Sequence, residues 1–208
     1  MNSRIVITLN VTPAQQQRLL ALQGAFAEVC NALAPLVQST RTWNRVALHH
    51  MAYKSLRERF PAVGSQMVCN AIYSVSRHCR ALFQAEGSPF HLGKLGDRPL
   101  PLLRFTDSCP VFFDRHTLSL KDGQLSMYTL DGRLRFQLDL RPEDEYSFHH
   151  RKLRELVLSR TAGNRFVLSF TFSEQDAAGG AANEVILEED EAGQIPRYLK
   201  VEEFHANA

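Results

Sequence analysis

Two Asp-Gly dipeptides in the middle of the chain constrain its fold more than any other feature. They stand at Asp122-Gly123 and Asp131-Gly132, inside a stretch from Val111 to Leu140 that is rich in β-forming residues. Asp and Gly supply the positive φ angles that tight hairpin turns require. We therefore predict antiparallel strands over residues 102–106, 111–113, 117–120, 124–130 and 133–140. A meander of this kind suits a small barrel.

The first hundred residues combine one strand with a helical region. Residues 5–11 alternate with the period of a half-buried strand, and Thr12 followed by Pro13 is typical of a helix start. Apolar residues then recur at spacings of three and four, which predicts a helix that ends near Pro35. A second helix is predicted over 42–60, closed by Pro61, with an apolar side formed by Trp43, Val46, Ala47, Met51 and Leu56.

A third helix is predicted over residues 65–85, with two distinct faces. Its buried stripe is expected to consist of Met67, Val68, Ala71, Ile72, Val75, Cys79, Leu82 and Phe83. The residues expected on or near the other face are Gln66, Asn70, Tyr73, Ser74, Arg77 and Arg80. The Gly- and Pro-rich stretch 87–101 that follows predicts an irregular connection.

After the meander, the pattern predicts a short helix over 142–154 and a hairpin of strands 156–159 and 165–172 around the turn 161–164. Residues 175–183 have the composition of a flexible linker. An acidic hairpin with strands 185–187 and 198–201 is predicted beyond them. Because an isolated hairpin is marginally stable, we expect it to dock on another surface.

The predicted fold class is α+β: a small, OB-like antiparallel β-barrel with an α-helical insertion after its first strand. Residues 1–11 and 101–173 form the barrel domain in this interpretation. Residues 12–100 form the helical lobe, and residues 174–208 form the linker and acidic tail. A chain of 208 residues is long enough for such a core.

The formal net charge of +2 hides an asymmetry along the chain. Residues 1–100 contain 11 Lys and Arg against 4 Asp and Glu, whereas residues 173–208 contain 2 against 9. A basic body indicates a polyanionic partner, and the acidic tail can either repel that partner or fold back onto the body. The alternative is a solvated surface whose charge is merely uneven.

Cysteine usage and hydropathy favour a cytoplasmic protein with no membrane contact. The four cysteines, at 30, 69, 79 and 109, form no CxxC pair, so we expect them to be reduced and mostly buried. No apolar run suggests a membrane span, and residues 1–11 lack the apolar block of a signal peptide. No cofactor is predicted, because the sequence contains no HExxH element, phosphate-binding Gly-rich loop or Ser-His-Asp arrangement.

The order of strand, basic helices and barrel meander resembles the N-terminal half of the TnpB (OrfB) proteins of insertion sequences, relatives of the type V CRISPR effectors. The resemblance covers residues 4–172. Its local matches to the family's recognition lobe are 53–61 (YKSLRERFP), 65–68 (SQMV) and 71–72 (AI). Those to the wedge-domain barrel are 114–120 (DRHTLSL), 129–133 (TLDGR), 155–158 (ELVL) and 165–170 (RFVLSF).

The resemblance implies binding without catalysis. In that family the wedge barrel and helical lobe hold the guide RNA, cradle the guide–target heteroduplex and read a short flanking DNA motif. A later RuvC-like domain with a GVDLG-like strand and a zinc ribbon does the cutting, and this sequence has neither. We therefore expect a protein that is not an enzyme, with a structured or guide RNA as its partner and target DNA as a further contact.

The predicted nucleic-acid contacts are basic and polar residues of the helices and of the late barrel segment. Cations serve phosphates, whereas Tyr53, Gln66 and Asn70 are the candidates for reading bases. The full set is Arg41, Arg45, Tyr53, Lys54, Arg57, Gln66, Asn70, Arg77, Arg80, Arg104, His149, Arg151 and Lys152. Arg59, Lys94, Arg98 and Arg154 are further candidates.

Other residues are given structural roles. Adjacent residues of a helix do not converge on one metal, so no metal site is predicted at His49-His50 or His149-His150. Trp43 and Phe60 are expected in the core. Asp107, Asp114 and Asp139 are interpreted as turn and surface residues.

Two other functions remain open at this point. The chain can be one subunit of a split RNA-guided effector, with a separate RuvC-containing protein docked by the acidic hairpin. It can also be a protein-interaction or regulatory subunit that no longer binds nucleic acid. A transposon remnant without function is the third possibility.

Overall fold

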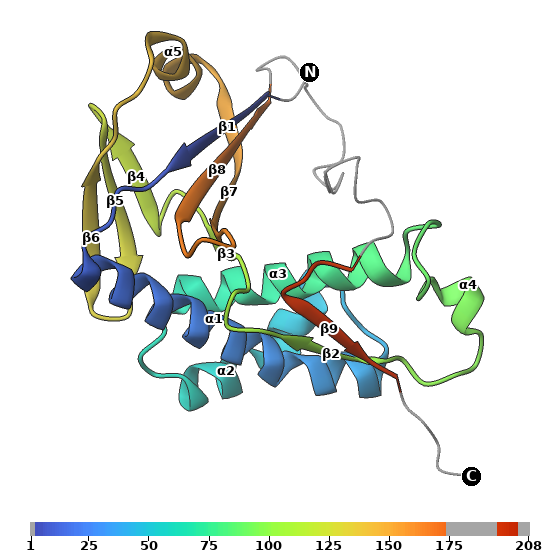
Figure 1. Cartoon of the computed structure of the whole chain (residues 1–208). Helices are drawn as coiled ribbons and strands as arrows, with labels where there is room; N and C mark the ends of the chain where they lie inside the picture. The colour runs from blue at the N-terminus through green and yellow to red at the C-terminus, as the bar shows by residue number, and fades with distance from the viewer. Residues whose placement is uncertain (1–2, 174–194, 204–208) are drawn as a thin grey trace. The chain divides into compact units, whose positions relative to one another are not determined.

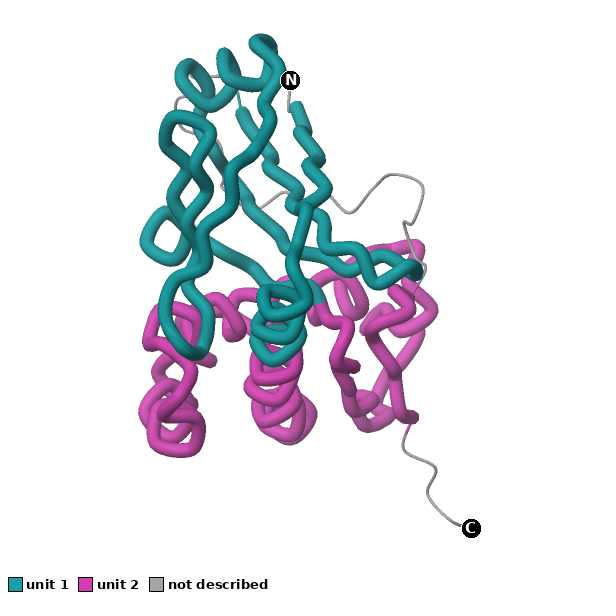
Figure 2. The backbone as a smooth tube through the Cα atoms, turned by 60° about the vertical axis from the view of Figure 1, so that its left-hand side comes forward, with its two compact units in different colours: residues 1–23, 110–182 teal, residues 24–109, 183–208 magenta. Residues whose placement is uncertain are grey.

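The computed structural model describes residues 3–173 and 195–203 and has an α+β fold with antiparallel sheets (Figure 1). The chain divides into two compact units (Figure 2). Unit 1 contains Met1–Gln23 and Pro110–Ala182, and unit 2 contains Gly24–Cys109 and Asn183–Ala208. The division falls inside helix α1 (Pro13–Thr40), which contributes to both units.

Unit 1 is built around a four-stranded antiparallel sheet. Its order is β1 (Ser3–Thr8), β8 (Phe166–Ser173), β7 (Lys152–Arg160) and β3 (Val111–Phe113). One face of this sheet is apolar, and its aromatic side chains Phe166, Phe170 and Phe172 are almost inaccessible to solvent. Burial of such side chains is the main stabilising term for the sheet.

A three-stranded antiparallel sheet completes the strands of unit 1. It consists of β4 (Leu118–Lys121), β5 (Gln124–Thr129) and β6 (Gly132–Gln137). The first hairpin turns at Asp122 and Gly123, with φ of 51° and 73°, and Gly132 has φ of 99° in the second. The prediction is confirmed for Asp122, Gly123 and Gly132, whereas Asp131 does not have a positive φ, and in the second hairpin Gly132 already pairs with Thr129.

Helix α5 (Pro142–His150) connects the two sheets of unit 1. Its Phe148 packs edge-on against Phe170 and Phe172, with ring centroids 4.9 Å and 5.1 Å away. Among the described strands of this unit, the hydrogen-bonded ladders form separate sheets and do not close into a ring. The confirmed part of the predicted fold is therefore the α+β class with an antiparallel meander.

Unit 2 is mostly helical. It contains the rest of α1, α2 (Arg45–Arg59), α3 (Ser65–Phe83), the single turn α4 (Leu92–Leu95) and a two-stranded sheet of β2 (Leu102–Phe105) and β9 (Leu199–Glu202). Twelve of the 19 residues of α3 are buried, which makes α3 the central element of the unit. The predicted apolar stripe of α3 is confirmed in full.

The predicted cap of α1 is confirmed, whereas α2 begins at Arg45 and not at residue 42, and its cap, Asn44, was not predicted. At the start of α1, the backbone N–H of Gln15 donates to the Thr12 hydroxyl, and the Thr12 N–H donates to the Gln15 side chain. This reciprocal pair is a capping box. Asn44 caps α2 by accepting hydrogen bonds from the N–H groups of Val46 and Ala47.

Helix α1 does not end near Pro35, as predicted, but continues to Thr40 with Pro35 inside it. Proline removes one helical hydrogen bond. Burial of Leu33, Ala34 and Val37 around it compensates for that loss, because these residues extend the apolar stripe past the proline. By length and composition α1 could span a membrane, and half of that apolar window is buried within the structure.

Two predicted helix faces are wrong. On α2 the buried residues are Leu48, Ala52 and Leu56, at helical spacing, whereas Val46 and Met51 are 62% and 45% exposed. On α3, Asn70 and Ser74 are buried and not on the outer face. The error on α3 arises because most of this helix is buried, so a two-faced pattern does not describe its environment.

The predicted strand at 102–106 forms, but it lies outside the meander. Strand β2 pairs antiparallel with β9, from Leu102 opposite Glu202 to Phe105 opposite Leu199. The predicted strand 198–201 is thereby confirmed, and its docking surface is the helical unit of the same chain. The other predicted tail strand, 185–187, and the linker 175–183 lie outside the described residues.

Candidate nucleic-acid interface

Helices α2 and α3 form an antiparallel pair joined by the short turn 60–64, and several predicted contact residues lie where the two meet. Arg45, His49 and Tyr53 follow one another at spacings of four along α2, which places them on one stripe. Gln66, Tyr73 and Arg77 form a similar stripe on α3. We call these six residues the α2–α3 seam.

Aromatic and cationic contacts organise the α2–α3 seam. The rings of His49 and Tyr53 stack with centroids 4.6 Å apart and planes 17° apart. The Arg45 guanidinium lies 5.4 Å from the centroid of the Tyr73 ring, so it links the two helices. Arg45 is exposed, whereas both tyrosines are half-buried and keep part of their rings accessible. Such groups can contact phosphates and stack on bases.

The remaining predicted cations of α2 differ in their surroundings. Lys54 and Arg59 are exposed, and Arg59 lies 5.2 Å from the centroid of the neighbouring Phe60 ring. Arg57 is half-buried, and its guanidinium donates to the Val63 carbonyl oxygen in the turn before α3. Arg57 therefore holds the α2–α3 connection, whereas Lys54 and Arg59 present their charge to solvent.

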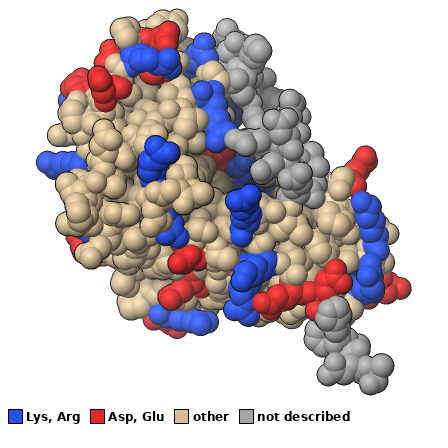
Figure 3. All heavy atoms as spheres, in the orientation of Figure 1, with Lys and Arg blue, Asp and Glu red and all other residues tan. Residues whose placement is uncertain are grey.

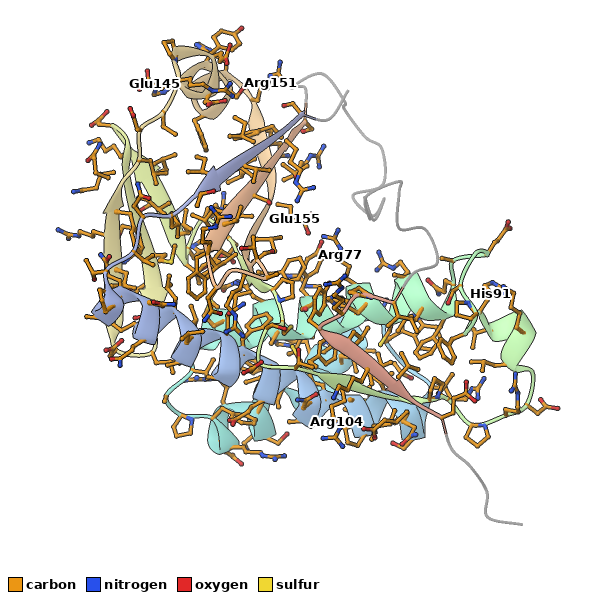
Figure 4. All side chains as sticks on the ribbon, in the orientation of Figure 1. Arg77, His91, Arg104, Glu145, Arg151 and Glu155 are labelled. Atoms are coloured by element: carbon orange, nitrogen blue, oxygen red, sulfur yellow. The ribbon has the colours of Figure 1, made fainter. Side chains whose placement is uncertain are left out.

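On α3 the predicted residues separate into accessible and buried side chains. Gln66, Arg77 and Arg80 are half-buried, and each makes contacts of its own (Figure 4 labels Arg77). Asn70 is only 7% exposed, and its amide nitrogen lies 3.8 Å from the Met67 sulfur. The prediction that Asn70 reads a base edge therefore does not fit, because its amide faces the core.

Three predicted cations stabilise the loop between α3 and β2. The Lys94 ammonium donates to the carbonyl oxygens of Glu86 and Ser88. Arg98 donates to the Lys94 and Leu95 carbonyls, and Arg41, in a left-handed conformation with φ of 50°, donates to the Arg98 carbonyl. The segment also has backbone hydrogen bonds of its own, such as those from His91 to Ser88 and from Arg98 to Leu95, and these side chains add further bonds to its carbonyl groups. Their role is structural in this conformation.

Arg104 of β2, labelled in Figure 4, is paired with an acidic residue of the C-terminal strand. Its guanidinium lies 2.7 Å from the Glu202 carboxylate of β9. Hydrogen bonding to Arg104 lowers the pKa of Glu202. A phosphate that bound Arg104 would lie beside this carboxylate and be repelled by its charge.

A buried histidine anchors the same strand. The Nδ1 of His78 lies 2.7 Å from the Ser74 carbonyl, so it carries the proton and donates, and Nε2 accepts from the Tyr198 hydroxyl at 2.9 Å. The rings of Phe105 and Tyr198 both meet the His78 ring edge-on. Burial lowers the pKa of His78 to about 4, so the neutral ring is the stable form.

The predicted residues of unit 1 lie at the end of α5 and the start of β7. His149 and Lys152 are exposed, and the half-buried Arg151 donates to the Ser3 hydroxyl of β1 (Figure 4). Arg154 donates to the Ser173 hydroxyl at 2.7 Å. His149 and Lys152 are accessible to a ligand. Arg151 and Arg154 instead hold the start of β7 to β1 and β8.

The turn role predicted for Asp114 is confirmed. Asp114 accepts from the N–H groups of His116 and Thr117, as a turn residue does. Cys30, Cys79 and Cys109 are buried, Cys69 is half-buried, and none of the four is in a disulfide. Across residues 3–173 and 195–203, no three His, Cys, Asp or Glu side chains come together in a metal-binding arrangement.

The cationic side chains form separated groups, several with acidic side chains beside them, on the face shown in Figure 3. One accessible cluster is absent from the predicted contact residues: the outward row of β5 and β6, which contains Tyr128, Arg133 and Arg135. The signal for it in the sequence is the register across the second hairpin, because the turn fixes which residues stand opposite each other.

A scan against protein-family models found no match to this chain, and a search of curated proteins found no significant match either.

Proposed function

We propose that this chain is a nucleic-acid-binding module similar to the N-terminal half of TnpB proteins, which holds a structured or guide RNA and contacts target DNA without cutting either. The observation that carries the proposal is the charge of its helical part. Residues 24–83 contain seven Lys and Arg against two Asp and Glu. Arg45, Lys54 and Arg59 all present their charge to solvent along α2.

The α2–α3 seam is the proposed contact surface in unit 2. In this proposal Arg45 binds a phosphate, Lys54, which follows Tyr53 in the chain, supplies a further charge, and Tyr53, stacked on His49, offers a ring for a base. Gln66 supplies an amide for a base edge. His149 and Lys152 are the accessible counterparts in unit 1.

In this proposal, the two sheets of unit 1 are the parts of an OB-like, wedge-type barrel. Their antiparallel meander, the two tight hairpins and the helix α5 before the last hairpin support this interpretation. The nuclease activity of the resembled family requires carboxylates that hold two metal ions in a RuvC-like domain, and none of the contacts proposed here uses such carboxylates. The proposed activity is therefore binding alone, in the cytoplasm.

The test is a titration of the full chain with fluorescently labelled RNA that copurifies with it, over a range of salt concentrations. If about five phosphates are neutralised, the logarithm of the affinity falls with that of the salt concentration with a slope of roughly −3 to −5. The double variant Arg45→Gln/Lys54→Gln should reduce the magnitude of that slope by about 1.5. Incubation of the complex with magnesium or manganese should leave RNA and DNA intact.

The control removes the same charge from two exposed arginines outside every proposed contact, Arg165→Gln/Arg197→Gln. This variant should retain most of the affinity and nearly the full salt slope. Equal losses in the two double variants, or salt-independent binding, would show that α2 is not the contact surface.

A protein-binding subunit is the second candidate function, and one observation favours it. Val46 and Met51 are large apolar side chains of α2 that remain 62% and 45% exposed. Exposed apolar side chains are suited to contact with a protein partner, such as a separate RuvC-containing chain. Under this candidate, Val46→Gln/Met51→Gln abolishes the association with the partner and leaves RNA affinity unchanged.

A further inference from the structure

The outward face of strands β5 and β6 presents an unusual row of side chains in unit 1. Three cross-strand pairs lie in register on it: Gln124 with Gln137, Ser126 with Arg135, and Tyr128 with Arg133. We call these six residues the sheet platform. None of them belongs to the α2–α3 seam, because the platform is part of unit 1 and the seam is part of unit 2 (Figure 2).

The side chains of the sheet platform are not part of the hydrophobic core. The opposite face of the same two strands carries Leu125, Met127, Leu134 and Phe136, all at most 6% exposed. Because these side chains bury the inner face, the outer face contributes little to the hydrophobic stability of the sheet. Tyr128 nevertheless stands on that outer face and is 44% exposed.

Tyr128 and Arg133 form a preorganised pair. The Arg133 guanidinium lies 4.1 Å from the centroid of the Tyr128 ring, a cation–π contact. The same guanidinium donates to the Ser126 hydroxyl at 3.1 Å and to the Ser126 carbonyl at 3.3 Å. A side chain held at two points loses less entropy when it binds a ligand.

Charge on the platform has one sign. It carries Arg133 and Arg135 and no carboxylate, and exposed Arg115 and Lys121 stand in the segments beside it. The carboxylate nearest to Tyr128 in the chain, Asp131 in the β5–β6 turn, is paired with Arg18 at 2.8 Å. Asp122 and Asp139 adjoin the other end, beyond Gln124 and Gln137.

We propose that the sheet platform binds a single-stranded stretch of nucleic acid, with a base stacked at Tyr128 and the backbone phosphates along Arg133 and Arg135. Charge complementarity selects a polyanion, and the accessible ring selects unpaired bases, because bases inside a duplex cannot stack on a side chain. The two glutamines supply amide groups for a neighbouring base edge. The acidic residues at that end fix where the strand leaves the surface.

The experiment uses the full chain and two labelled probes of mixed sequence, a single-stranded 12-mer RNA and the corresponding 12-base-pair duplex. Tyr128→Leu should weaken binding of the single strand by about tenfold, since stacking contributes strongly per base, and should leave the duplex nearly unaffected. Arg133→Gln/Arg135→Gln should weaken both probes and reduce the magnitude of the salt slope by about 1.5. In photo-crosslinking with a 4-thiouridine-containing 12-mer, the crosslinked peptide should contain residues of β5 or β6.

The matched control is Tyr146→Leu, which removes another exposed tyrosine, on α5 and outside the platform. Unchanged single-strand affinity in Tyr128→Leu, or an equal loss in Tyr146→Leu, overturns the proposal. The α2–α3 seam variant Arg45→Gln/Lys54→Gln separates this result from the proposed function. If the seam variant loses RNA affinity while the platform variants do not, the module binds RNA without the platform.

Discussion

At the scale of single residues, hydrogen-bonding partners decide which cations are available to a ligand. Arg57 is half-buried and donates to the Val63 carbonyl, whereas Lys54 and Arg59 remain exposed. A sequence shows all of these as equal charges. The same argument applies to His78, which is a neutral core residue held between a carbonyl and a tyrosine hydroxyl.

His78 makes the stability of unit 2 depend on pH. Its pKa is about 4 in the folded chain and 6.5 for an ordinary histidine, so the unfolded chain binds the proton more readily. The contribution of neutral His78 to the free energy of unfolding is therefore complete above pH 6.5 and is lost as the pH falls towards 4. Between pH 7 and pH 5, the wild-type chain should lose about 2 kcal/mol more unfolding free energy than His78→Phe, which cannot titrate.

Denaturant unfolding at the two pH values measures this difference. Trp43 is the only tryptophan, and its ring lies 5.2 Å from that of Phe83, so its fluorescence reports on unit 2. His116→Gln, at an exposed position of unit 1, is the control and should behave as the wild type. Parallel pH profiles for the wild type and His78→Phe would contradict the prediction.

At the scale of elements, β2 is stabilised from both edges. On one side it pairs with β9. On the other, the Asn31 side chain of α1 donates to the Phe105 carbonyl at 2.9 Å and accepts from the Phe105 N–H at 2.7 Å. The edge strand β2 thus has few unpaired backbone groups at this end, which explains how a short two-stranded sheet persists beside helices.

Strand β9 should contribute substantially to the stability of unit 2. Leu199 is 3% exposed, so Leu199→Ala should lower the free energy of unfolding by about 2–4 kcal/mol in the Trp43-monitored transition. Ile195→Ala, four residues earlier and 37% exposed, is the control and should cost less than about 1 kcal/mol. Similar values for the two variants would mean that β9 is not packed as described.

At the scale of the whole molecule, the acidic segment that includes Glu188, Glu189, Asp190 and Glu191 is tethered at both ends. It follows β8 of unit 1 and precedes β9 of unit 2, although the four residues themselves lie outside the described ones. A tethered acidic segment competes with nucleic acid at a high effective concentration. Removing residues 175–208 would also remove β9, so truncation cannot test competition alone.

Neutralising these four carboxylates to Gln or Asn should tighten RNA binding at low salt, and the gain should fade at moderate salt because the ions screen the competition. Binding titrations of the wild type and the variant at the two salt concentrations measure the effect. A variant with residues 184–194 in shuffled order keeps the charge and should bind as the wild type does. A gain that persists at moderate salt would exclude electrostatic competition.

The sequence by itself determined the local structure. Thr12 and Asn44 cap helices, the two Asp-Gly turns fix hairpins, and the apolar stripe of α3 is where its spacing predicts it, because each of these depends on residues close in the chain. Only the tertiary structure decided that α1 passes Pro35 and that Asn70 is buried. It also decided that β2 joins β9 and that Tyr128 faces outward beside Arg133. These outcomes depend on which distant elements cover each surface, and local pattern carries no information about that packing.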